Sequence, residues 1–414
     1  MDRRVVVTGL GAVTPLGNDV ETFWRAVRSN ESGIDHISSF DVSDYPSKVG
    51  GEVRDLDPSK YLDRREARRL DRFAMFAMVT AIEALADAGL ATDDLDAERT
   101  GCILGVGFGG IHTLHSEFKH LFDRGPKAVH PLLVPKMISN IAAGHIAIRI
   151  HAHGPSYTVV SACASANDAI GESYRWVKDG TVDIMVTGGA EAAVAPLALS
   201  GFSVLQAVTS SFNDDPKRAS RPFDKDRDGF VLGEGSGTLI LEELEHAKAR
   251  SAPIYCEVVG YGVTCDANHL TAPHPQGKGA VNAMKMAIAG SGLQLEDFDY
   301  VNAHGTSTQL NDSTETRAIK EVFGDHAGRM KVSSTKSMIG HLLGAAGGVE
   351  AIATIKGLQE QFYPATINYE TPDPECDLDY VPNHGQPAPM RAAINNAFGF
   401  GGHNAVVALK RYDG

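Results

Sequence analysis

The chain has 414 residues, of which 43% are hydrophobic and 22% are charged, and its net charge is −14. This length and composition are sufficient to bury one large core or two joined cores. The negative charge disfavours non-specific binding to nucleic acid or to an anionic membrane. We therefore expect neither nucleic acid nor membrane among the partners.

The N-terminus and the cysteines favour a cytoplasmic protein. The stretch MDRRVVVTGLGAVTP has a short apolar run broken by Gly and Pro, which is not the pattern of a signal peptide. No stretch approaches the roughly 18 uninterrupted apolar residues of a membrane helix. The five cysteines are scattered and form no C-x-x-C pair, which indicates a reducing compartment and no zinc site.

Short strand-like runs alternate with helical stretches along the whole chain, as in an α/β fold whose helices cover sheets. The expected strands are, in chain order, residues 3–9, 101–107, 157–163, 183–189 and 237–244, then 253–262, 300–305, 330–336, 392–399 and 405–411. The two groups of five correspond in order, and RRVVVTGLG resembles IYCEVVGYG. We therefore expect a tandem duplication with halves 1–251 and 252–414; chance similarity between two α/β segments is the alternative.

The stretch VVSACASAND, residues 159–168, predicts a buried strand followed by a helix that ends at Gly180. Cys163 is then expected at the N-terminus of this helix. The helix dipole and the unpaired amides there lower the pKa of a thiol and stabilise an oxyanion on an acylated sulfur. Small neighbouring residues leave room for an acyl group. A buried structural cysteine is the alternative.

Two later stretches supply candidate polar groups. NAHGTSTQLND, residues 302–312, places His304 at a strand end, and threonines that can hydrogen-bond a polar linker follow it. STKSMIGHLLGAAGGVE places Lys336 and His341 across a turn, with Glu350 on the helix that follows. A core histidine, a structural ion pair and tight packing of small residues are the alternatives.

A glycine-rich stretch near the C-terminus, NNAFGFGGHN, surrounds Phe398 and Phe400 and is expected to form a turn beside an apolar pocket. It lacks the Lys-Ser/Thr of a phosphate-binding loop. Three other stretches resemble binding motifs but fail their requirements. DKDRDGFVLGEG has Gly235 where an EF-hand needs Glu, and TGLGAVTPLG lacks the third glycine of a dinucleotide-binding loop. HAHG, residues 151–154, has two histidines but no third metal ligand placed by spacing. We therefore expect no metal and no redox cofactor.

Five motifs together resemble the condensing enzymes of the thiolase superfamily, and most closely the elongating β-ketoacyl-[acyl-carrier-protein] synthases of type II. The motifs are SACASA, NAHGTST, STKSMIGHLLGAAGGVE, FGFGGHN and RPFDKDRDGFVLGEGSG, and the resemblance extends over residues 3–411. It implies the thiolase fold, a duplicated βαβαβαββ unit in a five-layer αβαβα core.

The resemblance also implies a division of roles. Cys163 would carry the acyl chain as a thioester, and the amides of Cys163 and Phe400 would form the oxyanion hole. His304 and His341 would stabilise the enolate formed when malonyl-carrier protein loses carbon dioxide. Lys336 would set the local electrostatics. The supporting residues would be Glu350, Asp312 and Glu315.

Other positions correspond to substrate contacts in the family. Thr306 and Thr308 match residues that hydrogen-bond the pantetheine arm, together with Thr271. The apolar contacts would be Phe202 in the pocket wall, Phe398, Phe400 as the gate over the cysteine, and Phe108 where the acyl channel ends. The bulky ring of Phe108 is expected to shorten or reshape the pocket. The chain departs from the usual pattern at His403, commonly Thr, and in ASAND after Cys163, which leaves the substrate range open.

A basic stretch provides the candidate docking surface for acyl carrier protein. In YLDRREARRLDRF, residues 61–73, four arginines recur at helical spacing and are expected on one face of a helix: Arg65, Arg68, Arg69 and Arg72. A helix held by salt bridges to its own acidic residues is the alternative. Complementary charge would speed the encounter with an acidic carrier protein. The family also implies a homodimer, with the apolar segment 130–150 supplying pocket wall and interface.

These observations predict a decarboxylative condensation of malonyl-carrier protein with an acyl-enzyme in bacterial fatty acid elongation. A ketosynthase of a type II polyketide or specialised lipid pathway would use the same residues. A non-catalytic partner, like the chain-length factors, is the alternative from another class, but Cys163 and both histidines argue against it. A thiolase would need a second catalytic cysteine, which is not in the motif positions.

Overall fold

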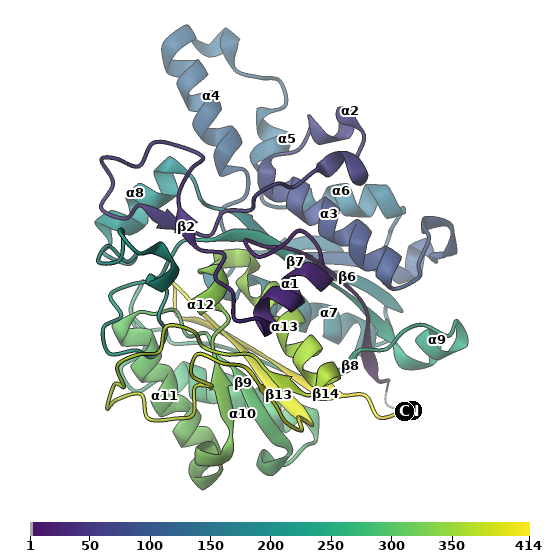
Figure 1. Cartoon of the computed structure of the whole chain (residues 1–414). Coiled ribbons are helices and arrows are strands. Elements are labelled where there is room, and N and C mark those ends of the chain that lie inside the picture. The colour runs from purple at the N-terminus through teal and green to yellow at the C-terminus, as the bar shows by residue number, and fades with distance from the viewer. Residues whose placement is uncertain (1–2) are drawn as a thin grey trace.

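The computed structural model describes residues 3–414, and its ten main strands form one continuous hydrogen-bonded series (Figure 1). The strands are β1 (Val5–Val13), β4 (Thr100–Gly105), β5 (Ser156–Val159), β6 (Ile184–Ala192), β7 (Glu234–Glu243), β8 (Cys256–Cys265), β9 (Phe298–Asn302), β10 (Lys331–Ser333), β13 (Ala392–Gly399) and β14 (His403–Arg411). Each overlaps one of the ten expected runs. Two short hairpins lie outside this series: β2 (Asp35–His36) with β3 (Val49–Gly50), and β11 (Phe362–Tyr363) with β12 (Gln386–Pro387).

The strand order repeats in the two halves and confirms the expected duplication. In β1-β7-β6-β4-β5 the successive pairs are antiparallel, antiparallel, parallel and parallel. The series β8-β14-β13-β9-β10 has the same directions. One extra residue interrupts the register at the same place in each half, Thr8 in β1 and Val259 in β8. The boundary between residues 251 and 252 stays a prediction.

Helices cover both halves and fill the space between them, which gives the five expected layers (Figure 1). The outer helices are α3 (Arg72–Asp87) and α6 (Ile141–Ile150) on the first half, and α10 (Lys278–Ser291) and α11 (Gln309–Phe323) on the second. The central layer holds α7 (Ser165–Lys178) and α13 (Ala346–Glu360), which pack against strands of both halves and against each other. The segments that carry Cys163 and His341 therefore lead into this central layer, at the starts of α7 and α13.

The remaining helices lie at the edges of this core. They are α1 (Val20–Arg28), α2 (Arg64–Ala67), α4 (Ile111–Arg124), α5 (Leu133–Met137), α8 (Pro196–Val204), α9 (Leu244–Ala249) and α12 (Lys336–Ile339).

None of the helices in residues 3–414 is long and apolar enough to cross a membrane. All five cysteines lie in that range, and each is a free thiol.

Backbone contacts bring the outer helices unusually close to the sheets, and the contacts repeat between the halves. A Cβ added at Gly9 or Gly11 would lie 2.1 or 2.0 Å from a carbonyl oxygen of α3. A Cβ at Gly260 or Gly262 would lie 2.1 or 2.0 Å from a carbonyl oxygen of α10. These four positions of the aligned stretches RRVVVTGLG and IYCEVVGYG therefore need glycine for the same steric reason.

The expectation of a buried strand before the cysteine was wrong. β5 is the last strand of the series, so only one of its edges is paired, and its residues are exposed or half-buried. The side chain of Val160 is 58% exposed. An apolar run does not distinguish a central strand from an edge strand that is covered by something else.

The close approach of β8 to α10 predicts a large steric effect of one added methyl group. We expect Gly262→Ala to lower the free energy of unfolding by about 1–3 kcal/mol, since the methyl collides with backbone that cannot rotate away. Urea unfolding followed by circular dichroism measures it. Gly290→Ala is the control, because Gly290 is exposed on α10 and the nearest atom to a Cβ there is 3.9 Å away. An equal loss in both variants would contradict the steric explanation.

Candidate active site

The candidate nucleophile lies in a tight turn between strand and helix, as the sequence predicts. β5 ends at Val159, a single turn of 3-10 helix spans Ala162–Ala164, and α7 begins at Ser165. Ala162 has a left-handed φ of 52°. The Ser165 hydroxyl accepts a hydrogen bond from the Ser161 N–H (2.9 Å) and donates to the Ala162 carbonyl (2.6 Å). These bonds hold Cys163 in the turn directly before the helix.

The end of β13 passes directly over this turn. A Cβ at Gly399 would lie 2.7 Å from the Ser161 carbonyl oxygen and 3.0 Å from the Cys163 amide nitrogen, so only glycine allows the approach. The next residue, Phe400, donates its backbone N–H to the Cys163 sulfur. The structure therefore brings Cys163 and the Phe400 amide together, although more than 200 residues separate them.

The expected lowering of the thiol pKa is not observed. Burial raises the pKa of Cys163 to about 12, although the charge of Lys336 and the Phe400 N–H act in the opposite direction. The physical reason is that the turn lies beneath packed strands and helices, where removal of water from a thiolate outweighs the attraction of a helix N-terminus. Cys163 is thus a neutral thiol before reaction.

Two buried histidines lie beside each other in the second half. His304 follows β9, and His341 precedes α13; their ring centroids are 5.3 Å apart and their planes are nearly perpendicular, at 83°. Burial, together with the positive charge of Lys336, holds the pKa of both rings well below 6.5. Both imidazoles are therefore neutral at physiological pH.

The hydrogen bonding of His341 determines where its proton is carried. Its Nδ1 accepts a hydrogen bond from the Leu343 N–H at 3.3 Å. A neutral ring that accepts at Nδ1 carries its proton on Nε2 and can donate there. In the described part of the chain His304 Nδ1 has no hydrogen-bond partner. His341 is therefore preset as a neutral hydrogen-bond donor.

Lys336 and Glu350 form a buried ion pair that joins the start of α12 to α13. Each side chain is only 1% exposed. Burial raises the pKa of the Glu350 carboxyl, and Lys336 opposes this rise. Lys336 acts electrostatically on Cys163 and on both histidines. The four residues named as catalytic in the sequence thus belong to one cluster.

Glu315 and Asp312, on the first turns of α11, hold the backbone around His304. Glu315 accepts the N–H groups of His304 and Gly305, both at 2.8 Å, and burial raises its pKa to about 7. Asp312 accepts the Phe223 N–H at 2.9 Å and pairs with Arg227 at 3.5 Å. Both carboxylates therefore support the site without entering it.

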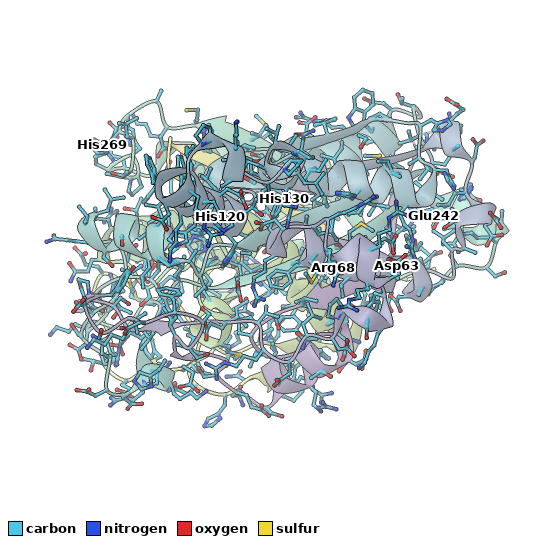
Figure 2. All side chains as sticks on the ribbon, turned by 90° about the horizontal axis from the view of Figure 1, so that it is seen from above. Asp63, Arg68, His120, His130, Glu242 and His269 are labelled. Carbon is cyan, nitrogen blue, oxygen red and sulfur yellow. The ribbon has the colours of Figure 1, made fainter. Side chains whose placement is uncertain are left out.

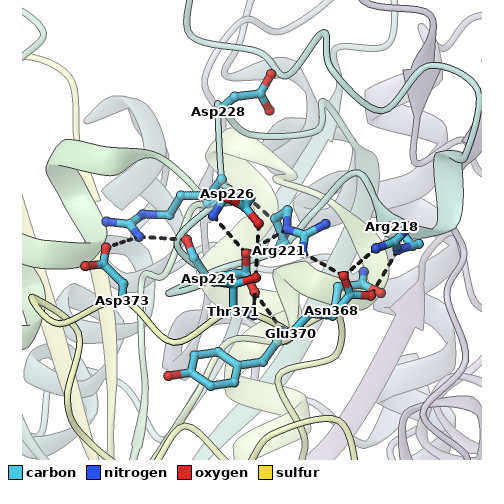
Figure 3. Close-up of polar contacts among 12 residues, drawn as sticks. Arg218, Arg221, Asp224, Asp226, Asp228, Asn368, Glu370, Thr371 and Asp373 are labelled. Carbon is cyan, nitrogen blue, oxygen red and sulfur yellow. Dashed lines mark hydrogen bonds and ion pairs between the residues drawn. The ribbon is translucent and has the colours of Figure 1, made fainter.

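A charged network anchors the segment RPFDKDRDGF to residues 368–373 (Figure 3). Arg221 bonds Asp224 at 3.0 Å and Glu370 at 3.0 Å, and Asp224 also accepts backbone N–H groups of the 370–371 segment. The Arg221 N–H donates to the Ser307 hydroxyl at 3.0 Å. Of the acidic residues that resemble an EF-hand, Asp224 and Asp226 therefore hold the 370–371 segment, whereas Asp228 accepts the N–H groups of Ser210 and Ser211.

The predicted pantetheine contacts fall into two groups. The hydroxyls of Thr306 and Thr308 are 2.9 Å apart, and Thr308 caps the N-terminus of α11. Thr271 is exposed on a separate loop. That loop is tied to the glycine-rich turn after Phe400 by a hydrogen bond of 2.7 Å from the Gly401 N–H to the Leu270 carbonyl.

An aromatic series lines the apolar side of the site. Phe202 faces Phe108, Phe230 and Phe400, with ring centroids 6.1, 5.2 and 6.4 Å away. Phe398 packs instead on the ring of His304, at 5.7 Å. Phe230, whose ring also lies 5.3 Å from that of His341, was not predicted from the sequence. Its place in the GFVLGEG motif was the available signal.

The arginine-rich stretch does not form one helical face, so that prediction was wrong. α2 covers only Arg64–Ala67, and Asp71 caps a new helix that begins at Arg72. Arg65, Arg68 and Arg69 are exposed, but Arg72 bonds Glu234 with its Nε at 3.0 Å and stacks over Phe76. The aspartate cap interrupts the periodicity that the arginines suggest.

Fold and site together define a cysteine-dependent acyltransferase in a duplicated α/β scaffold. Residues 2–247 match the family model "Beta-ketoacyl synthase, N-terminal domain", and residues 255–370 match "Beta-ketoacyl synthase, C-terminal domain". The chain belongs to the β-ketoacyl synthase family, and the expected thiolase fold is confirmed.

Full-length relatives support this assignment. The chain is 52% identical over 410 residues to "3-oxoacyl-[acyl-carrier-protein] synthase 2" of Synechocystis sp., covering 99% of this chain and 98% of the relative. A Staphylococcus aureus protein of the same name is 46% identical over 412 residues, covering 100% and 99%. The structure "The ishigamide ketosynthase/chain length factor" matches with a TM-score of 0.94 at 36% identity, covering 100% of both chains.

The burial of the histidine pair predicts an unusual titration. Because their pKa values lie well below 6.5, both rings should stay neutral between about pH 6.5 and 8. Nitrogen-detected NMR of the rings, assigned with His304→Asn and His341→Asn, should show His341 protonated only on Nε2. An imidazolium signal for either ring at neutral pH would contradict the assignment.

Proposed function

We propose that the chain catalyses the decarboxylative condensation of malonyl-[acyl-carrier-protein] with an acyl group held on Cys163, in fatty acid elongation. The observation that carries this proposal is the convergence of a half-buried thiol, a backbone donor from Phe400, two neutral histidines and a buried Lys336–Glu350 pair. The relatives named above carry that activity in their names.

The first half-reaction loads the enzyme. The Cys163 sulfur attacks the thioester carbonyl of an acylated carrier protein, the bond from that carbon to the carrier's sulfur breaks, and the thiol proton passes to the departing sulfur. The N–H groups of Cys163 and Phe400 stabilise the intervening oxyanion. A neutral thiol fits this step, because one proton must leave as the sulfur attacks.

The second half-reaction forms the carbon–carbon bond. Malonyl thioester loses carbon dioxide, and the electron pair of the broken bond becomes an enolate. Neutral His304 and His341 donate hydrogen bonds to its oxygen. The enolate carbon then attacks the Cys163 thioester, the cysteine sulfur departs as a thiolate and takes a proton from water, and a β-ketoacyl-carrier protein is released. Lys336 remains paired with Glu350 and supplies a fixed positive charge.

Intact-mass measurement tests the loading step most directly. Incubation with acyl-carrier proteins of short to long chain length should add one acyl mass to the wild type and none to Cys163→Ala. The exposed thiol at Cys265 provides the matched control, so Cys265→Ala should load like the wild type. The absence of an adduct with every chain would overturn the proposed function and favour a non-catalytic partner.

A ketosynthase of a specialised lipid or polyketide pathway is the second candidate. It is supported by the neighbour titled "AntDE:AntF (apo): type II PKS acyl-carrier protein in complex with its ketosynthase bound to the hexaketide", with a TM-score of 0.92 at 33% identity. The bulky Phe108 also favours an unusual pocket. Since the 52% identical relative is a synthase of type 2, elongation remains the primary proposal.

We propose that acyl carrier protein docks on Arg65, Arg68 and Arg69, which are exposed on α2 and the turn after it. α2, α4 and α5 lie together at one end of the molecule (Figure 1), and Figure 2 views this end with Arg68 and Asp63 labelled. Arg72 is left out, because its guanidinium is engaged by Glu234. A cluster of free guanidinium groups suits an acidic partner.

The docking surface predicts a salt-sensitive defect. The triple variant Arg65→Glu, Arg68→Glu, Arg69→Glu should raise KM for acyl-carrier protein about tenfold at low salt, and the gap to wild type should narrow at high salt. Activity on an acyl-pantetheine without the carrier protein should be unchanged. Arg329 is also exposed but lies in the second half of the chain, so Arg329→Glu serves as the control and should leave KM unchanged. An equal loss on acyl-pantetheine would contradict docking.

We further propose a homodimer that forms in the cytoplasm through the unpaired edge of β5. Large apolar side chains are exposed on β5, next to it, and on α4, α5, α6 and α8: Phe118, Phe122, Val134, Ile148, Tyr157, Val160, Leu197 and Val204. Two of them, Val134 and Ile148, belong to segment 130–150. An apolar surface beside an open strand edge is typical of an interface between copies.

A further inference from the structure

Glu191 is a fully buried carboxylate that the proposed mechanism does not use. It lies near the end of β6 and is 0% exposed. Within residues 3–414, its hydrogen bonds come from backbone N–H groups: Gly107 at 2.7 Å, Phe108 at 3.1 Å and Gly344 at 3.3 Å. Burial raises its pKa to about 7 despite these donors. Burying a carboxylate costs free energy, so a buried carboxylate beside the site is a candidate for a functional role.

The carboxylate joins segments from the two halves of the molecule. Gly107 and Phe108 follow β4, whereas Gly344 lies in the turn between His341 and α13. A Cβ at Gly107 would lie 2.4 Å from Glu191 Oε2, and a Cβ at Gly344 would lie 2.3 Å from the Gly107 nitrogen. Both positions therefore need glycine so that the two backbones can share one carboxylate.

This contact fixes the backbone of Phe108, which the family resemblance places where the acyl channel ends. The ring of Phe108 is 47% exposed and meets Phe202 edge-on at 6.1 Å. Phe202 in turn faces the gate residue Phe400. Because Phe108 is half-exposed, its own packing restrains it weakly, and the hydrogen bond from its N–H to Glu191 fixes the backbone from which the ring meets Phe202.

We propose that Glu191 is a positioning residue that sets acyl-chain selectivity by fixing the backbone of Phe108 against the turn that follows His341. The proposal rests on the proposed function, since selectivity is expressed only when Cys163 accepts acyl chains. Glu191 itself does not touch the acyl group.

Glu191→Gln separates this role from a purely structural one. Glutamine keeps the shape but retains one acceptor oxygen, and its NH₂ group then faces a backbone N–H. Glu83 offers a matched control on α3. It also accepts two backbone N–H groups, from Ala12 at 2.9 Å and Val20 at 2.8 Å, and burial likewise raises its pKa to about 7.

The test measures second-order loading rates of Cys163 by intact mass for a short and a long acyl-carrier protein. We expect Glu191→Gln to change the long-to-short ratio about tenfold, the discrimination that one or two methylenes provide in a pocket. The ratio should be unchanged in Glu83→Gln. If the wild type loads no acyl chain, the proposed function is wrong. If the wild type and Glu191→Gln both load acyl chains with the same long-to-short ratio, only the inference about Glu191 is wrong.

A double-variant cycle tests whether Glu191 acts through Phe108. Phe108→Ala should itself change the chain-length profile, and Glu191→Gln should then add nothing to it, because the ring that the carboxylate positions is gone. Additive changes would overturn the proposal. Should Glu191→Gln fail to fold, Glu191→Asp keeps the charge but withdraws it from the two segments, and the same change in ratio is expected. Failure of both variants to fold would make Glu191 a residue of the fold instead.

Discussion

The buried charge of Lys336 is the interaction on which the electrostatics of the site depends. Lys336 and Glu350 are each 1% exposed, and removing either would leave the other uncompensated at a cost of about 3–5 kcal/mol. After the effect of burial, the Lys336 charge acts on every reacting group: it favours the thiolate of Cys163 and disfavours the imidazolium of both histidines. One fixed cation thus favours a cysteine that can leave as thiolate and histidines that donate as neutral rings.

The site around Lys336 has low polarity because the backbone segments of the central layer pack closely, and the Lys336 charge is therefore weakly screened. A Cβ at Gly348 of α13 would lie 2.7 Å from the Gly237 carbonyl oxygen of β7, and a Cβ at Gly347 would lie 2.4 Å from Asn167 Oδ1 of α7. The glycines of GAAGG therefore let the central helices approach each other and the sheets. Water is excluded as a result, which explains both the raised pKa of Cys163 and the lowered pKa values of the histidines.

Local patterns in the sequence were sufficient to predict the ten strands, the turn at Cys163 and the residues around His304 and Lys336. What failed depends on contacts that no local pattern carries. The pKa of Cys163 follows from burial by distant segments, and the exposure of Val160 follows from the place of β5 at the end of the sheet. Glu191 was missed because its donors lie at positions 107, 108 and 344.

One departure from the family pattern near the nucleophile, the segment ASAND, supports the turn that holds Cys163. Asp168, in ASAND, accepts hydrogen bonds from the Tyr261 hydroxyl at 2.7 Å and from the Ser161 hydroxyl in the nucleophile turn. Burial raises the pKa of Asp168, and the charge of His403 acts to lower it. Since Ser161 lies two residues before Cys163, Asp168 anchors the nucleophile turn to Tyr261 of β8. It replaces no group that reacts, so the catalytic cluster is retained while its surroundings differ from the usual pattern.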